Sequence, residues 1–302
     1  MAGRETQSIG TRLVVLVPYA WLVAFFLVPC LIILKISLSQ TVLAQPPYEP
    51  VLDLSAGWAG IRDFLAGLSA DNYATLAGDT LYLASYLKSL EVAALSTALL
   101  LVIGYPVAYA MARAPGRIQA VLVMLVILPF WTSFLIRVYA WIIILQGDGL
   151  FNRALGLVGI APRPWLATDT AVYIGIVYSY LPFMVLPLYA TLQKLDEALL
   201  EAAADLGCPR RKAFWTVTLP LSLPGAVAGG LLCFIPIVGE FVIPDLLGGS
   251  QTIMIGQTLW TEFFANRDWP VASAIAIVLL CVLVGPIAAF EHMRLRDARR
   301  RS

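Results

Sequence analysis

The sequence predicts an all-α integral membrane protein with six membrane-spanning helices, and three observations lead to that prediction. The 302 residues are 60% hydrophobic and only 13% charged, whereas soluble domains carry about 25% charged residues. Six stretches contain no charged residue and are long enough to cross the bilayer, which takes about 20 helical residues. In each stretch the apolar run is continuous, which is typical of a helix; strands of membrane barrels alternate instead.

The predicted spans are Leu13–Leu34, Val92–Met111, Ile118–Ile136, Ala171–Gln193, Leu219–Gly239 and Trp269–Phe290. The first is expected to stay as an uncleaved helix, because its apolar core is longer than the roughly 7–15 residues of a signal peptide. An even number of spans places both termini on the same side of the membrane.

The distribution of basic residues orients these spans. The side that holds the termini carries 13 of the 20 lysines and arginines, and the opposite side carries seven over longer loops. The positive-inside rule therefore places both termini in the cytoplasm. We expect one membrane domain over residues 1–302, with a cytoplasmic N-terminus (1–12), a periplasmic segment with short helices (36–85), a cytoplasmic loop (194–218) and a cytoplasmic tail (291–302).

Side chains that bind metals or act as nucleophiles are scarce. The four cysteines form no CxxC pair, and the single histidine, His292, lies among the charges of the tail. The net charge of +1 gives no reason to expect a nucleic-acid partner. Composition therefore predicts neither a catalytic nor a metal site.

The loop 194–218 predicts a short amphipathic helix, because the residues of the segment DEALLEAAADL are strong helix formers. Glu197, Glu201 and Asp205 recur every four residues and share one face. Gly207 fits the position that ends a helix. An acidic face fits a basic protein surface better than the anionic lipid of the inner leaflet, which indicates a docking element. The alternative is an interfacial helix that only anchors the loop.

A signature in this loop carries a resemblance to a known family. Glu201-Ala202-Ala203, Gly207 and Val217-x-Leu219-Pro220 match the pattern EAA-x3-G-x9-I-x-LP, with valine in place of isoleucine. The chain resembles the membrane subunits of ATP-binding-cassette (ABC) importers that receive their cargo from a binding protein. The resemblance implies the type I importer permease (MetI-like) fold and a coupling helix that docks on an ATPase subunit, with Glu197, Glu201, Ala202, Ala203, Asp205 and Gly207 as its coupling residues.

The resemblance also implies partners. The chain has no G-x4-G-K-[ST] loop, so it is expected to bind no cofactor itself, and ATP and Mg²⁺ would be used by a separate ATPase. The implied complex holds a second homologous permease, two copies of the ATPase and a periplasmic substrate-binding protein, in the inner membrane of a bacterium.

Four further stretches, among them LPFWTSFLIRVYAW and GEFVIPDLLGG, resemble the polyamine importer permeases, most closely the putrescine type. Two alternatives stay open. One is the same machine with another cargo, such as thiamine, ferric ion, an opine or an aminophosphonate. The other is an ion-coupled carrier, which predicts an inverted repeat and no docking loop.

Three acids are candidates for a substrate path or gate, since ionisable groups at membrane depth usually face the bundle interior or a water-filled path. These are Glu240, which ends the fifth span, Asp245, which follows it, and Glu91. A structural hydrogen bond is the alternative for Glu240, and pairing with Lys88 is the alternative for Glu91.

Aromatic faces attract alkyl-ammonium groups, and four aromatic residues are further candidates: Tyr139, Trp141, Tyr178 and Tyr180. Membership of the interfacial aromatic belt is the alternative for them. Arg137 is a candidate to pair with one of the acids and hold an outer gate.

Overall fold

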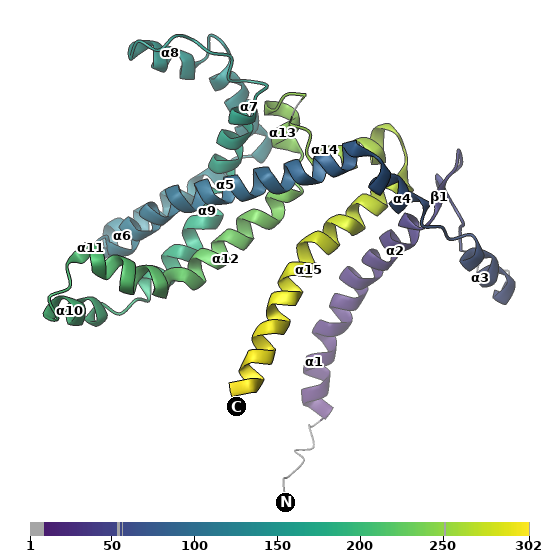
Figure 1. Ribbon diagram of the computed structural model, residues 1–302, viewed down its shortest axis with the longest axis horizontal. Helices are drawn as coiled ribbons and strands as arrows, with labels where there is room; N and C mark the ends of the chain where they lie inside the picture. The colour runs from purple at the N-terminus through teal and green to yellow at the C-terminus, as the bar shows by residue number, and fades with distance from the viewer. Residues whose placement is uncertain (1–8, 53–54, 56, 251, 302) are drawn as a thin grey trace, which may run out of the picture. The chain divides into compact units, whose positions relative to one another are not determined.

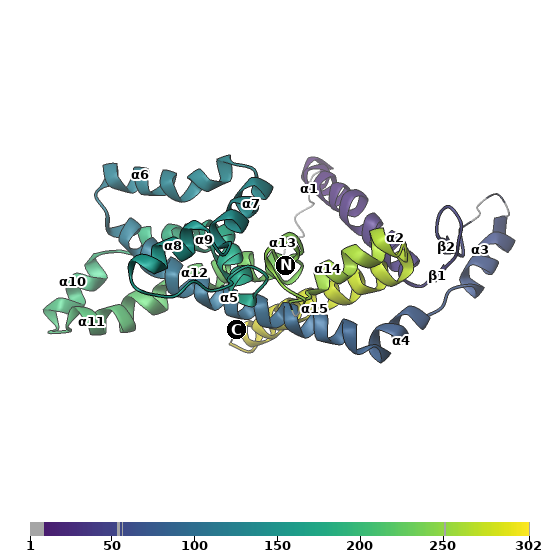
Figure 2. The same cartoon turned by 90° about the horizontal axis from the view of Figure 1, so that it is seen from above.

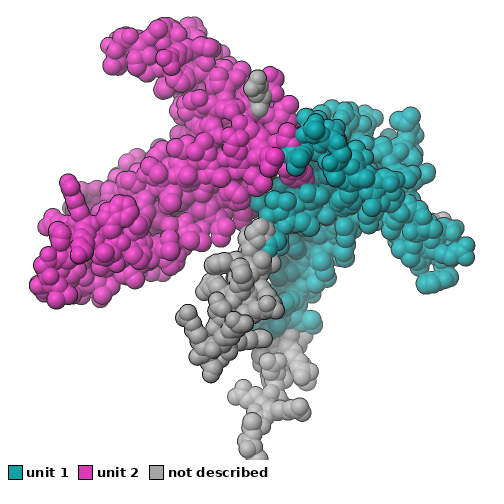
Figure 3. All heavy atoms as spheres, viewed as in Figure 1, with its two compact units in different colours: residues 1–83, 259–302 teal, residues 84–258 magenta. Residues whose placement is uncertain are grey.

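The computed structural model describes residues 9–52, 55, 57–250 and 252–301, with side chains described only within residues 14–285. The first eight residues of the expected cytoplasmic N-terminus lie outside the described residues, and so do the side chains of the expected tail. The chain splits into two compact units, residues 1–83 with 259–302 and residues 84–258 (Figure 3). Each unit is described by itself.

The first unit holds a continuous apolar span, Val14–Ser37, which is built from three helical pieces. These are α1 (Ile9–Leu22), a π-helical turn η1 (Val23–Leu27) and α2 (Val28–Ser37). The span packs alongside α15 (Trp269–Arg301), and the two helices run side by side in Figure 1. The remaining elements are β1 (Gln40–Thr41), β2 (Tyr48–Glu49), α3 (Gly57–Ala66), α4 (Asp71–Gly78) and η4 (Thr261–Ala265).

The segment 36–85 contains the short helices that the sequence predicts, and also a feature that it does not. The strands β1 and β2 form a small antiparallel ladder that pairs Gln40 with Glu49 and Thr41 with Tyr48. The hydroxyl of Thr41 donates to Asp268 (2.6 Å), and Asp268 also accepts the backbone N–H of Val271 in the first turn of α15. The hairpin is therefore tied to the start of α15.

The second unit is built around three long helices: α5 (Thr80–Arg113), α9 (Asp169–Gln193) and α12 (Leu219–Val238). At one end of these helices lie α10 (Ala198–Asp205), α11 (Arg210–Ala213) and the π-helical turn η3 (Phe214–Thr218) (Figure 1). Helix α13 (Val242–Leu247) lies near the other end. The remaining elements are α6 (Gly116–Ile127), η2 (Leu128–Trp131), α7 (Phe134–Leu145), α8 (Leu150–Leu157) and α14 (Ile255–Trp260).

The helices α9 and α12 approach closely because glycine lines their contact. A Cβ atom on Gly225 would lie 2.5 Å from Thr191 Oγ1 and 2.9 Å from the Pro187 carbonyl oxygen, and one on Gly229 would lie 3.0 Å from Met184. Gly225 and Gly229 are four residues apart, as in the GxxxG pattern that lets helix backbones meet in membranes. The same methionine also meets α5, since a Cβ on Gly104 of that helix would lie 3.0 Å from Met184 Cγ. Met184 is fully buried and sits at the centre of this packing.

The predicted span Ile118–Ile136 is broken by a sharp bend, three residues after Pro129. Helix α6 and the 3-10 turn η2 end at Trp131, and α7 starts at Phe134 at an angle of 90° (Figure 2). Thr132 ends the first helix, because its backbone N–H and its hydroxyl both donate to the Pro129 carbonyl oxygen (3.3 and 2.8 Å). Thr132 is also extended (ψ 152°), so the chain leaves the helix there. Uninterrupted hydrophobicity gives no signal for this bend.

The described residues contain four helices that are long and apolar enough to cross a membrane, or five spans if the bent pair counts as one. They are Val14–Ser37, Thr80–Arg113, Asp169–Gln193 and Arg210–Val238, with α6–η2 and α7 as the bent pair. A sixth apolar helix, Trp269–Gly285, is shorter than this criterion over the part that has described side chains. The exact count of six therefore stays a prediction. The second span begins at Thr80 instead of Val92, because the helix continues beyond its apolar part through Lys88 and Glu91.

The glycine contact predicts a contrast between two neighbouring glycines of α12. Gly225→Ala should lower the thermal stability of the purified protein, by an amount typical of overpacking (about 1–3 kcal/mol), because the new methyl group meets Thr191 and Pro187. Gly230→Ala is the matched control: its Cβ would lie 3.8 Å from Thr97, and alanine is the better helix former. Equal melting temperatures of the two variants in detergent would contradict the close contact.

Candidate functional site

The short helix expected in the loop 194–218 is present as α10, and its end has the geometry that the sequence predicts; its role as a coupling helix stays a prediction. Gly207 has φ +77°, a left-handed conformation that residues with a Cβ rarely adopt. Its N–H donates to Ala204 O (2.8 Å), and the N–H of Cys208 donates to Ala203 O (2.9 Å). These two bonds form a Schellman motif, which satisfies the last carbonyls of a helix. The signature places its glycine four residues after its second alanine, and this is the separation that the Schellman motif requires between Ala203 and Gly207.

The surface of α10 is exposed on nearly all sides. None of its residues is buried, and the carboxylates of Glu201 and Asp205 are exposed, as is Glu197 before the helix. The apolar side chains of Leu199 and Leu206 are also exposed, at 47% and 89%, although an amphipathic helix lying on its own protein would bury them. An exposed helix with an acidic and apolar surface fits a partner protein.

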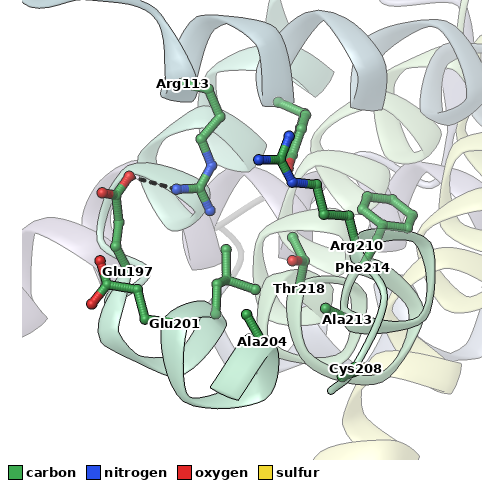
Figure 4. A pocket seen from close by; sticks show the side chains of 11 residues that line it. Arg113, Glu197, Glu201, Ala204, Cys208, Arg210, Ala213, Phe214 and Thr218 are labelled. Atoms are coloured by element: carbon green, nitrogen blue, oxygen red, sulfur yellow. Dashed lines mark hydrogen bonds and ion pairs between the residues drawn. The ribbon is translucent and has the colours of Figure 1, made fainter. Parts of the chain in front are cut away.

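A cleft of about 410 Å³ lies between α10, the end of α5 and the α11–η3 segment (Figure 4). The Arg113 side chain crosses it, and its Nη1 donates to Glu197 Oε1 at 2.6 Å. The guanidinium also lies 5.6 Å from the centroid of the Tyr109 ring. Glu197 therefore has a partner within this chain. Among the described residues, Glu201 and Asp205 form no ion pair.

Glu240 is buried at 8% exposure and hydrogen-bonds through both carboxylate oxygens. The Tyr180 hydroxyl donates to Oε2 (2.6 Å), and the backbone N–H groups of Val242 and Ile243 donate to Oε1 (3.1 and 3.4 Å). The carboxylate thus satisfies free donors in the first turn of α13, as side-chain oxygens do at helix starts. The hydrogen bonds that the structural alternative requires are observed, and a role of Glu240 in the path stays a prediction. Two expected path residues, Glu240 and Tyr180, are brought into direct contact.

A row of aromatic rings extends from this pair to Arg137. Tyr180 lies beside Phe183 (6.0 Å between ring centroids), and Phe183 meets Phe130 edge-on (5.2 Å). The Arg137 guanidinium lies 5.4 Å from the Phe130 centroid. Trp141 and Tyr178 form a separate edge-on pair at 5.4 Å, and Tyr139 is exposed at 54%, as expected of a belt residue.

Arg137 does not pair with an acid within the described part of the chain. Its side chain is 9% exposed, and Nε and Nη1 have no hydrogen-bond partner. Besides Phe130, it lies 5.7 Å from the Phe134 ring. The expected ion pair that would hold a gate is therefore not observed in this conformation, since aromatic faces surround the guanidinium.

The remaining acids lie elsewhere. Glu91 is 61% exposed, and its Oε2 lies 3.5 Å from Lys88 Nζ. The same ammonium lies closer to Asp169, at 2.8 Å from Oδ2. Asp169 also accepts a short hydrogen bond (2.5 Å) from the Thr252 hydroxyl. Asp245 is exposed and accepts a long hydrogen bond from Gln257 (3.4 Å). The cluster of Lys88, Asp169 and Thr252 was not predicted, because only the fold brings these three residues together.

Over residues 101–290 the chain matches the family of binding-protein-dependent transport system inner membrane components. The chain belongs to this family. It is the membrane component of an ABC importer, and the expected MetI-like permease fold is confirmed. This family is the membrane component of the transport system and is not its ATPase. The sequence agrees, since it contains no G-x4-G-K-[ST] loop.

The permease is similar to two polyamine permeases. It is 37% identical over 278 residues to the spermidine/putrescine transport system permease protein PotB of Haemophilus influenzae, over 90% of this chain and 91% of the relative. It is 42% identical over 215 residues to the protein of the same name from Escherichia coli, over 70% of this chain and 78% of the relative. Both relatives are named for spermidine and putrescine together, so they do not distinguish the expected putrescine type.

A solved structure supports the fold. The permease resembles a chain in the crystal structure of a bacterial alginate ABC transporter in complex with an alginate pentasaccharide-bound periplasmic protein. The TM-score is 0.73 at 16% sequence identity, with 95% of this chain and 94% of that chain covered. At this identity the likeness concerns the fold alone.

Two substitutions of Gly207 test whether its left-handed conformation is needed for α10 to bind a partner. Gly207→Ala should weaken co-purification with the ATPase subunit, because a left-handed alanine costs about 1–2 kcal/mol and the end of α10 shifts. Gly207→Asn should bind nearly as well as the wild type, since asparagine adopts this conformation more readily. No atom lies within 4 Å of the added Cβ, so the contrast depends on backbone conformation. Equal losses in both variants would show that the position tolerates no side chain at all.

Two substitutions of Glu240 distinguish a structural role of its hydrogen bonds from a role of its negative charge in transport. Glu240→Gln keeps an acceptor for the amides of α13 and can donate to Tyr180, so we expect unchanged thermal stability and reduced uptake. Glu240→Ala should also lower stability, since an unsatisfied buried donor costs about 1–3 kcal/mol. Melting curves and uptake by the reconstituted complex measure the two effects. Full uptake by Glu240→Gln would leave Glu240 with a structural role only.

Proposed function

We propose that this permease carries a polyamine, putrescine or spermidine, across the inner membrane after delivery by a periplasmic binding protein. Two copies of a separate ATPase subunit drive the transport, and a second, homologous permease completes the membrane part. The observation that carries the proposal is the 37% identity with a spermidine/putrescine permease over 90% of the chain. That similarity extends well beyond the family signature, which is common to importers of different cargoes.

The chemistry of four candidate path residues fits such a cargo. A polyamine is a flexible alkyl chain with several ammonium groups, and aromatic faces and carboxylates are the groups that attract it. Tyr180 with Glu240, and Trp141 with Tyr178, provide such groups in the second unit. Few fixed charges along the path also favour release, because a transport path has to bind its cargo weakly.

The exposed surface of α10 supports docking on an ATPase. The helix buries none of its residues in this chain, and its end is fixed by the Schellman motif. In the proposed orientation α10 lies in the cytoplasm together with both termini, as the distribution of lysine and arginine indicates. ATP-driven closure of the two ATPase subunits would then displace α10 and the helices that follow it.

Uptake by the reconstituted complex tests the cargo. Proteoliposomes that contain the permease, its partners and internal ATP should accumulate radiolabelled putrescine or spermidine when the binding protein is added outside. Radiolabelled thiamine and ferric ion serve as competing cargoes, and liposomes without the ATPase subunit serve as the control. Import of thiamine or iron without any import of polyamine would overturn the polyamine assignment and leave the importer intact.

A further inference from the structure

The coupling helix is attached to the rest of the second unit along the chain and through one ion pair. The chain enters α10 from α9 and continues through α11 and η3 into α12, and these last three elements form the continuous helical segment Arg210–Val238. The ion pair joins Glu197 to Arg113, the last residue of α5. Because α10 buries no residue of its own, this ion pair is the described polar contact that ties it directly to α5.

Arg113 belongs to a stack of side chains on one face of α5. Tyr105, Tyr109 and Arg113 follow one another at intervals of four residues, and therefore line the same side of the helix. The Arg113 guanidinium lies over Tyr109, and both Tyr109 and Tyr105 meet the Phe214 ring edge-on at 5.8 and 5.7 Å. Figure 4 shows Arg113 reaching Glu197 on one side of the cleft, with Phe214 on the other.

Phe214 extends this contact into α12. It lies in η3, the turn that leads directly into α12. The Tyr105 hydroxyl lies 2.8 Å from the Ser222 hydroxyl of α12 in a buried hydrogen bond. Contacts therefore run without interruption from Glu197 through Arg113 and the aromatic rings to the first turns of α12.

The energy of the ion pair depends on docking. Glu197 is 75% exposed and Arg113 is 26% exposed in the free chain, where water screens the pair and such contacts contribute roughly 0–1 kcal/mol. A protein surface that covers α10 removes part of this water, and the attraction between the two charges then grows. Breaking the pair in the assembled state would then leave one charge without its partner in a less hydrated place, which is costly.

We propose that Arg113 and Glu197 are positioning residues that couple displacement of α10 to α5, with Tyr109 and Phe214 carrying the contact on to α12. The proposal rests on the proposed function, in which an ATPase subunit moves α10. It also revises the expected role of Glu197, which serves the connection inside the permease while Glu201 and Asp205 face the partner. Loss of the ion pair is therefore expected to uncouple ATP hydrolysis from transport and to leave assembly intact.

The experiment measures uptake and ATP hydrolysis of the same reconstituted complex and takes their ratio. Arg113→Gln and Glu197→Gln should each lower the amount of cargo moved per ATP several-fold, with unchanged co-purification of the ATPase subunit. The double variant should be no worse than either single variant, because both remove one shared interaction. The reversed pair, Arg113→Glu with Glu197→Arg, should recover part of the ratio.

Arg117→Gln is the matched control. Arg117 is an exposed arginine in the first turn of α6, four residues after Arg113, and forms no ion pair among the described residues. This variant removes the same charge without breaking the contact, and its ratio should equal that of the wild type. An equal decrease in Arg117→Gln would attribute the effect to net charge and overturn the proposal.

Two further outcomes would overturn it. One is an unchanged ratio in both single variants. The other is loss of the ATPase subunit from Glu197→Gln but not from Arg113→Gln, which would make Glu197 a docking residue. The wild-type complex is measured first with each candidate cargo, so a wrong cargo is recognised before the variants are compared. The ratio is then taken with the cargo that is imported; a wild type that binds no ATPase subunit refutes both proposals.

Discussion

The close contact between α9 and α12 is the constraint on which the second unit depends. Gly225 and Gly229 let the two backbones meet where any side chain would collide with Thr191, Pro187 or Met184. The ends of these two helices also define the coupling segment, because α10 follows α9 and η3 leads into α12. A fixed distance between α9 and α12 thus sets the span that the coupling segment has to bridge.

The parts of this arrangement that the sequence predicts are those specified by neighbours along the chain. Gly207 could be assigned to the end of α10 because helix termination is local: the left-handed residue and both backbone hydrogen bonds lie within the six residues Ala203–Cys208. The fold class follows from uninterrupted hydrophobicity for a similar reason, since each span satisfies its own backbone hydrogen bonds. The spacing of the family signature contains the same local information.

Contacts between distant residues could not be predicted in this way. Arg113 and Glu197 are 84 positions apart, and nothing in either neighbourhood identifies the partner. The size of the bend after Trp131 could not be predicted, because the apolar run continues through it; Pro129 signals only that the helical ladder is weakened nearby. For Glu240 the sequence indicated an unusual buried acid but not its hydrogen bonds, which depend on Tyr180 from another helix.

Helix α5 is held near both of its ends by ion pairs to other elements of the second unit. Lys88 binds Asp169 at the start of α9, and Arg113 binds Glu197 beside α10. The 26 residues from Lys88 to Arg113 extend over about 38 Å at 1.5 Å per residue. Pro106 lies between these two anchors and lacks the backbone N–H that would complete the helical ladder. A helix that is fixed at both ends and weakened at one internal position bends there when one end is displaced. Pro106 is thus the weakest point of the helical ladder between the two anchors, and it lies seven residues before the arginine that binds Glu197.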